Sequence, residues 1–273
     1  MIPPLFSIDL PVGVCSFEAV SAHLLPCRRK TLLPKNAKSI LVVLFPYYLG
    51  EEAYAEANIS RYAVPADYHD IVGAMLAEAC AKLRKAWPEH QFVPFCDNSP
   101  IPEVYAAAKA GLGVIGKNGL LIHPRYGSFC FIGEVVTDLA LSPTGDAIRT
   151  CCGCGRCENS CPAGALLGGS VAKAHCLSAV TQQKQELTEA QRLQILQSGC
   201  VWGCDICQTV CPQNQNAEKT PIAAFYQTAI PYITADTPID GRAFAWRGER
   251  VIRRNLAIFE KNEPDKNANR RED

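Results

Sequence analysis

Apolar residues in the first half of the chain recur at the spacings expected of buried strands and one-sided helices. Residues 40–45 form a continuous apolar run that stops at Pro46, so a buried strand is expected over residues 39–45. After Asp67, which can cap a helix, apolar side chains recur every three or four residues. The predicted helix therefore has one face that packs on a sheet, comprising Tyr68, Ile71, Val72, Met75, Leu76, Ala79 and Leu83.

Strand and helix signals continue to alternate along the first half of the chain. Residues 91–95 predict a second strand, and a short Ala-rich helix begins around Pro102 and ends at Gly111. Residues 128–136 are rich in β-branched and aromatic side chains and predict another strand. The expected fold class is therefore mixed, α/β (α+β). A basic helix is expected near residues 249–259, followed by a polar tail that should fray.

The composition is that of a protein that folds by burying apolar side chains. Of 273 residues, 48% are hydrophobic, which allows one large or two modest domains. The 27 basic residues balance 27 acidic ones, so no global charge attracts nucleic acid or an anionic membrane. A local basic strip could still act, and it comprises Arg247, Arg250, Arg253 and Arg254.

The sequence contains no signal for export or membrane insertion. Nothing near the amino terminus has the basic and then apolar pattern of a secretory signal, and the longest apolar run is far shorter than the roughly 20 residues of a membrane-spanning helix. We therefore expect a cytoplasmic protein with no membrane partner. Reducing conditions there favour metal binding or catalysis over disulfides for a chain with 15 cysteines.

The cysteines are distributed unevenly. Five lie in the first 150 residues, whereas the other ten crowd between Cys151 and Cys211. This step in composition predicts three segments. Residues 1–148 would form the mixed α and β module, residues 149–219 a ferredoxin-like module, and residues 220–273 a carboxyl-terminal extension.

The cysteine-rich segment contains the spacing C-x-x-C-x-x-C-x-x-x-C-P, which starts at Cys151 and ends at Pro162. This is the spacing of bacterial ferredoxins, in which three thiolates bind one [4Fe–4S] cluster and the fourth binds a second cluster. A partner motif is therefore required. The segment from Cys204 to Pro212 supplies it, but Val201 stands where the first thiolate of a full repeat should be.

The exchange of ligands between the two motifs assigns most of the cysteines. One cluster takes Cys151, Cys154, Cys157 and Cys211, and the other takes Cys161, Cys204 and Cys207. The eighth ligand is either Cys176 or Cys200, and the spacing leaves both open, with Cys152 as a spare. A pair of zinc knuckles is the alternative, but zinc sites need neither the third cysteine nor the two Cys-Pro endings.

Two shorter patterns resemble cofactor motifs without their structural context. Residues 111–118 match G-x-G-x-x-G and nearly match a phosphate loop, yet a helix and not a strand is predicted before them. A glycine-rich turn is therefore favoured over nucleotide binding. Residues 67–69 start like the corrinoid-ligand motif D-x-H-x-x-G, but Val72 replaces the glycine, so His69 is expected to be structural.

Asp97 follows a predicted strand and precedes a predicted helix. A carboxylate in that place most often caps or turns the chain. The carboxyl end of a strand is also where ligand crevices open in α/β sheets, so a general acid is the second interpretation. The residues themselves leave both interpretations open.

Several motifs occur together in the order in which they occur in epoxyqueuosine reductases, and the resemblance covers roughly residues 38–260. Linked motifs in one order are more specific than any single motif. They are residues 60–63, 67–69, 97–100 with Glu103, 110–117, 127–129, 133–134 and 137–138, the ferredoxin motif, and residues 176–181 and 203–212.

The resemblance implies a cobalamin-dependent iron–sulfur reductase, related to reductive dehalogenases, that reduces epoxyqueuosine to queuosine in transfer RNA. A low-potential donor of the ferredoxin or flavodoxin type would supply electrons to two [4Fe–4S] clusters of this chain, and residues 1–148 would hold cobalamin and substrate. Asp97 matches the family's proton donor, and Cys176 matches its eighth cluster ligand. By the same analogy the corrinoid pocket is lined by Gly113, Gly116, Lys117, Gly127 and Ser128.

Two departures from the family pattern bear on the substrate. Val104 stands where the family usually has Arg, and the sequence ends soon after residues 253–258, where the family continues into a helical-repeat domain that helps to hold transfer RNA. The resemblance is thus to a short form, and a related small molecule is an alternative substrate. A two-cluster electron-transfer protein without bound corrinoid is the alternative from another functional class.

Overall fold

A four-stranded antiparallel sheet organises the first half of the chain in the computed structural model, which describes residues 2–260. Its strands lie in the order β1-β2-β6-β3, and every neighbouring pair is antiparallel. They are β1 (Val12–Ser16), β2 (Ser39–Pro46), β3 (Phe92–Cys96) and β6 (Cys130–Thr137). The mixed fold predicted from the sequence is confirmed, and because no strand of this sheet is parallel to its neighbour, α+β describes it.

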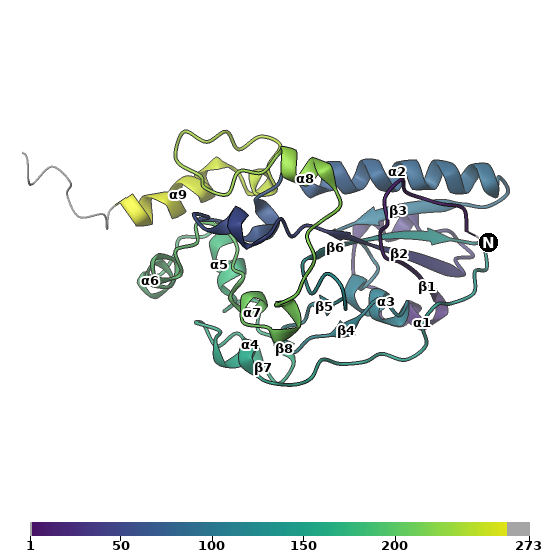
Figure 1. The fold of residues 1–273 in the computed structure, drawn as a ribbon, viewed down its shortest axis with the longest axis horizontal. Helices are drawn as coiled ribbons and strands as arrows, with labels where there is room; N and C mark the ends of the chain where they lie inside the picture. The colour runs from purple at the N-terminus through teal and green to yellow at the C-terminus, as the bar shows by residue number, and fades with distance from the viewer. Residues whose placement is uncertain (1, 261–273) are drawn as a thin grey trace, which may run out of the picture.

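Helices cover both faces of the sheet, as Figure 1 shows. On one face lies α2 (Tyr68–Ala86), which packs against β3 and β6. On the other lie α1 (Glu18–Ser21) and α3 (Glu103–Lys109). The predicted apolar stripe of α2 is confirmed, since Val72, Leu76, Ala79 and Leu83 are fully buried. Its predicted cap is confirmed too, because Asp67 Oδ1 accepts a hydrogen bond of 3.0 Å from the His69 backbone N–H.

The remaining elements are short and carry the cysteines. Their α-helices and strands are β4 (Val114–Ile115), β5 (Leu121–Ile122), α4 (Arg156–Asn159), β7 (Leu166–Leu167), β8 (Ser170–Val171), α5 (Leu177–Gln182), α6 (Glu189–Ser198), α7 (Ile206–Thr209), α8 (Ala223–Gln227) and α9 (Glu249–Glu260). Turns of 3-10 helix span Arg28–Leu32, Glu51–Tyr54, Arg61–Ala63, Pro212–Asn214 and Ala245–Arg247. The predicted basic helix is confirmed as α9, and the predicted polar tail lies outside the described residues.

One apolar core runs across the segment boundaries predicted from the sequence. Trp202, Phe225 and Leu256 are buried in the same cluster of side chains as the inner face of α2. Backbone hydrogen bonds reinforce this continuity, including one of 2.8 Å from the Ser60 N–H to the Trp202 carbonyl. The cysteine-rich segment is therefore packed against the sheet module over a shared core. None of the helices within residues 2–260 combines the length and hydrophobicity needed to cross a bilayer.

Candidate functional site

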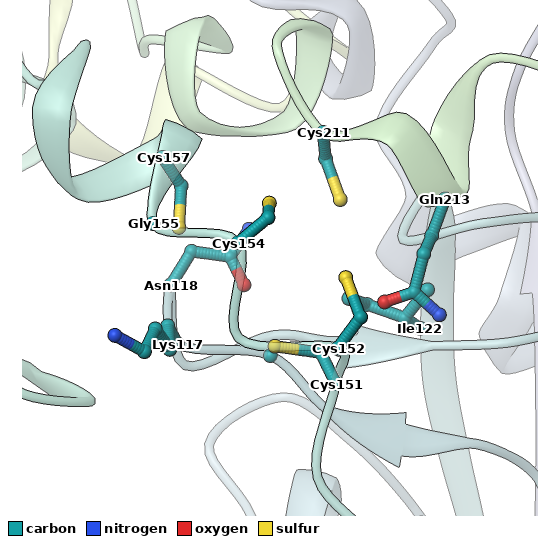
Figure 2. A pocket seen from close by; sticks show the side chains of 11 residues that line it. Lys117, Asn118, Ile122, Cys151, Cys152, Cys154, Gly155, Cys157, Cys211 and Gln213 are labelled. Atoms are coloured by element: carbon teal, nitrogen blue, oxygen red, sulfur yellow. The ribbon is translucent and has the colours of Figure 1, made fainter.

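The first cysteine cavity is formed where the turn between β4 and β5 and the loop after β6 meet the segment after α7. Figure 2 shows its cysteine side chains gathered around one space. They are Cys151, Cys152, Cys154, Cys157 and Cys211. Gly153 and Gly155 have φ angles of 71° and 74°, a region that favours glycine, so the loop can wrap tightly around this space. The sequence-derived ligand set of one cluster is thus brought together.

A second and larger cavity, of about 710 Å³, contains the other predicted ligand set. The predicted ligands on its lining are Cys161, Cys176, Cys204 and Cys207, and Cys130 of β6 lines it as well. Cys200 is absent from this lining, and its thiol donates a hydrogen bond of 3.1 Å to the Trp202 carbonyl. Of the two candidates for the eighth ligand, the structure brings Cys176 to the other three. We call this space the large cavity.

The spacing of the cysteines differs from that of a zinc site. A single zinc ion draws its sulfur ligands to about 2.3 Å from one point. Within residues 2–260, no three His, Cys, Asp or Glu side chains are arranged so that they could hold one metal ion. The cysteines instead surround open spaces, as the ligands of a multi-iron cluster do.

The rest of the large cavity is built mainly from aromatic and other apolar side chains. Among them are Tyr47, Tyr62, Tyr68, Leu120 and Phe131, with Trp246 and Arg247 at one border. Its lining contains no His and no carboxylate. A large, mostly apolar space with few polar groups is typical of a cofactor or ligand site. A corrinoid fits this lining, provided that its metal needs no ligand from the protein.

Asp97 borders a separate space of about 180 Å³, which we call the Asp97 cavity. Glu103 and Val104 line it as well. Five further residues line both this space and the large cavity: Tyr68, Leu120, Ser128, Cys130 and Phe131. The Asp97 cavity and the large cavity are therefore separated by no more than these shared side chains.

Asp97 is held in an unusual backbone conformation. Asp97 and Asn98 have φ angles of 50° and 40°, and they are the only non-glycine residues with positive φ in the described part of the chain. Such conformations cost energy and cluster at functional sites. The carboxylate accepts a hydrogen bond of 3.3 Å from the Tyr68 hydroxyl. It also lies 3.3 Å from His69 Nε2, so two side chains of α2 fix its position.

His69 stands between two carboxylates. Its Nδ1 lies 2.7 Å from Asp67 Oδ1, and its Nε2 faces Asp97. Asp67 first, and Asp97 second, raise the pKa of His69 to about 9. Conversely, the His69 hydrogen bond lowers the pKa of Asp97, despite the opposing effect of burial. At neutral pH the proton of this pair therefore resides on His69, and Asp97 is ionised.

The residues predicted for the corrinoid pocket are placed in three different surroundings. Ser128 lines the large cavity and the Asp97 cavity. Gly116 and Lys117 line the first cysteine cavity instead. Gly113 and Gly127 lie on neither lining, and a Cβ at Gly113 would come within 2.4 Å of the Ile122 carbonyl. The glycine-rich residues 111–118 follow α3 and contain the short strand β4, so they lack the strand and helix context of a nucleotide loop.

Polar residues of α7 and of the turn after it tie the cysteine-rich segment to the residues just before β6. The Asn214 side chain accepts a hydrogen bond of 2.8 Å from the Ser128 backbone N–H, and the Ser128 hydroxyl donates one of 2.9 Å to Gln208. Gly127 has a φ of 59°, and a Cβ there would lie 2.3 Å from the Asn214 side-chain oxygen. Glycine at residue 127 therefore permits this close approach.

His69, which the sequence predicts to be structural, is the residue beside Asp97 that the sequence did not connect with it. The only available signal was its place two residues after a helix cap, and that signal is equally typical of a solvated helix start. Its partner Asp97 is distant in the sequence and reaches it only because β3 ends beside the first turn of α2. Ligand crevices at the carboxyl ends of strands are typical of parallel sheets. Asp97 follows such a strand end and borders a cavity although this sheet is antiparallel.

Two family models match the chain. Residues 28–98 match the family described as "Epoxyqueuosine reductase QueG, DUF1730", and residues 150–214 match the "4Fe-4S double cluster binding domain". The second match supports iron–sulfur binding by the cysteine-rich segment.

Curated relatives are epoxyqueuosine reductases. The chain is 39% identical over 201 residues to that of Gloeobacter violaceus, covering 71% of this chain and 62% of the relative. It is 37% identical over 202 residues to that of Synechocystis, covering 72% of this chain and 69% of the relative. The chain thus spans about two thirds of the length of these relatives.

Solved structures with the same name share the fold. The epoxyqueuosine reductase of Streptococcus thermophilus superposes with a TM-score of 0.77 at 25% identity, over 94% of this chain and 79% of that one. Another, described as an epoxyqueuosine reductase with a tRNA-Tyr epoxyqueuosine-modified stem loop, gives a TM-score of 0.76 at 24% identity, over 91% and 76% of the two chains.

Proposed function

The chain belongs to the epoxyqueuosine reductase family, and from this premise we propose that it is an iron–sulfur oxidoreductase that removes the epoxide oxygen of epoxyqueuosine. One observation carries the proposal. The large cavity is bordered on one side by four cysteines and on another by residues that also line the Asp97 cavity. A source of electrons and a source of protons would therefore face one space.

Two [4Fe–4S] clusters are proposed from the two cysteine sets. Cys151, Cys154, Cys157 and Cys211 would hold the first, and Cys161, Cys176, Cys204 and Cys207 the second. Electrons would enter from a low-potential donor of the ferredoxin or flavodoxin type. Residues 1–148 would hold cofactor and substrate, residues 149–219 the clusters, and residues 220–273 would form the extension.

Cobalamin is the proposed occupant of the large cavity. Its volume and apolar lining suit a bulky planar cofactor, and the absence of His and carboxylates from the lining suits one without a protein axial ligand. When bound, a corrinoid supplies a strongly reducing metal that can drive cleavage of a carbon–oxygen bond. Tyr68, Ser128 and Phe131 would contact it from the side of the Asp97 cavity, and the cysteines of the second set from the opposite border.

The residues around Asp97 would manage protons. Asp97 is the proposed proton donor to the departing oxygen, and Tyr68 and His69 hold its carboxylate in place. Since Asp97 is ionised beside a protonated His69, each turnover would draw the proton through the pair from His69. In this proposal His69 is a positioning and proton-storing residue.

The proposed substrate is epoxyqueuosine within transfer RNA, by analogy with the relative solved with a modified stem loop. The basic strip predicted from the sequence is largely engaged within the protein. Arg250 pairs with Glu186 at 2.8 Å, Arg253 pairs with Glu249, and Arg254 donates to the carbonyls of Gln183 and Gln185. Val104, on the Asp97 cavity, leaves a small-molecule substrate as the second candidate, since it offers no charge to a phosphate.

The proposal is tested on anaerobically reconstituted protein. We expect about eight irons per chain, stoichiometric binding of cobalamin in a visible-absorption titration, and reduction of epoxyqueuosine when a low-potential reductant is supplied. Turnover of modified transfer RNA is compared with turnover of the free nucleoside to separate the two substrate candidates. A full iron content without cobalamin binding or turnover would contradict the reductase and favour the electron-transfer protein.

A further inference from the structure

Removal of an epoxide oxygen as water breaks two C–O bonds, forms one C=C bond, and consumes two electrons and two protons. The electrons would come from the low-potential donor of the proposed function, on which this inference rests. Asp97 delivers one proton at a time. A second proton must therefore reach Asp97 after the first has been transferred.

Glu134 is a carboxylate buried without a counter-ion. It lies on β6 opposite Val42 of β2 and Phe95 of β3, on the face of the sheet that α3 covers. Its exposed fraction is 0%, and neither carboxyl oxygen has a hydrogen-bond partner of standard geometry. Burial raises its pKa well above the ordinary value, and the Ser99 side chain acts in the opposite direction. An ionised carboxylate in that position would be very costly, so Glu134 is neutral.

Glu103 connects Glu134 to the Asp97 cavity. It is the first residue of α3, and its side chain lines the cavity together with Asp97. Burial, and then the charge of Asp97, raise the pKa of Glu103 to about 7. Glu103 in turn raises the pKa of Glu134. The two side chains therefore titrate as a pair that retains protons near neutral pH.

Among the described residues, no ion pair neutralises these two carboxyl groups. Besides Asp97, the ionisable groups that act on one or both of them include Arg29, whose charge lowers the pKa of Glu134, together with Tyr68, Cys15 and Cys96. Burial of the Cys96 thiol raises its pKa, and the same holds for Cys15, so both are uncharged. Arg29 donates to the Pro94 carbonyl at 3.3 Å and lies over the Phe95 ring at 4.9 Å. Within the described residues, no ion pair joins it to Glu134.

We propose that Glu103 and Glu134 form a buried acid pair that stores a proton and passes it across the Asp97 cavity to Asp97, which supplies the second proton of epoxide removal. Glu134 is the closed end of this route, Glu103 its cavity-lining member, and Asp97 its outlet. His69, on the opposite side of Asp97, supplies the first proton. The pair returns to its neutral form by taking up a proton from water through the cavity.

The first test reads the proton directly and needs neither substrate nor cofactor. Infrared spectra of protein with 13C-labelled glutamate are recorded between about pH 5 and pH 9. We expect a protonated-carboxyl band that persists at neutral pH in the wild type, is lost or displaced in Glu103→Gln and Glu134→Gln, and is unchanged in the exposed control Glu89→Gln. The absence of that band at neutral pH in the wild type would overturn the shared proton.

The second test measures whether the proton held by Glu103 and Glu134 is used in the reaction. Either Gln variant should lower kcat by roughly 10²-fold with little change in KM and with unchanged iron content, and it should remove the pH dependence near 7. Wild-type rates and an unaltered pH profile in both variants would overturn the delivery of the proton. A protein that has the infrared band but reduces no epoxide would overturn the proposed function and with it the second-proton role. A protein that turns over without the band would overturn the acid pair alone.

Discussion

The two cysteine-lined cavities are similar in ligand chemistry and differ in their surroundings. In the first cysteine cavity Cys152 and Cys154 are exposed, and the neighbouring Lys117 forms an ion pair of 2.7 Å with Glu158 at the surface. The large cavity is bordered by aromatic side chains and adjoins the Asp97 cavity. One set of thiols therefore faces the outside of the molecule, and the other faces the space in which chemistry is proposed.

The different surroundings of the two cysteine sets indicate how a ferredoxin-like motif can be incorporated into an oxidoreductase. In a free ferredoxin both clusters exchange electrons with other proteins. Here the first cysteine cavity has two exposed thiols, whereas the four thiols of the second set are half-buried and line the large cavity. The same spacing rule thus gives two unequal sites, because only one of them borders a large apolar space.

The largest effect is expected when a ligand of the second cysteine set is removed. Cys176→Ala should remove about half of the iron and abolish turnover, because the second cluster loses one of its four ligands. The matched control is Cys200→Ala, whose thiol bonds the Trp202 carbonyl and should leave iron content and turnover near wild type. Iron and sulfide analysis of the purified proteins measures this, and iron loss in the Cys200 variant alone would reverse our ligand assignment.

A smaller effect is expected from a change that spares both cysteine sets. Asp97→Asn keeps the shape of the side chain and removes the acid, so turnover should fall by about 10²- to 10⁴-fold while iron content stays constant. Steady-state kinetics with a chemical reductant measures the loss, and Asp236→Asn on the surface serves as control. Normal turnover by the Asn variant would remove Asp97 from the reaction and return it to the role of a turn residue.

The smallest effect is expected from changing His69, which controls the pH dependence of turnover. His69 loses its proton as the pH rises through about 9, so turnover should fall above that pH. His69→Gln should lower turnover by about tenfold, because Gln still hydrogen-bonds Asp97 but carries no proton to give. It should also abolish the alkaline limb of the pH profile.

The same His69 pairing stabilises the fold, fully below about pH 6.5 and no longer above about pH 9. Thermal unfolding across that window should show the loss in the wild type and a flat profile in His69→Gln. His90→Gln, which changes a histidine paired with Asp138 elsewhere, should retain the wild-type profiles. A full alkaline limb in the His69 variant would assign that limb to another group.

Features encoded by nearby residues could be predicted from the sequence. The fully buried β2 strand, the stripe and cap of α2, and the helix at the carboxyl end all follow from local periodicity. The two cysteine sets follow from spacing, because ligand exchange between ferredoxin motifs is itself a geometric rule. Only the choice of Cys176 needed the family resemblance.

Features that depend on distant pairings could not be predicted. Alternating strands and helices do not specify strand direction. The antiparallel order of the sheet depends on the pairing of β6 with β2 and β3, which are distant in the sequence. Likewise, nothing local indicates that His69 meets Asp97, or that Glu134 is buried without a counter-ion. The glycines predicted to line the corrinoid pocket lie in different surroundings, because a glycine in the sequence does not indicate which cavity its backbone faces.

The contact between Asn214 and Gly127 bears on how such a protein can change over evolutionary time. A ferredoxin-like segment is commonly pictured as a cassette that is inserted or exchanged whole. Here Asn214, just past the second Cys-Pro, packs closely against Gly127, which lies shortly before the strand that borders both reaction cavities. A transplanted cassette without that amide, or a recipient strand with a larger residue at 127, would leave the two halves out of register. Residues 127 and 214 are therefore constrained to change together.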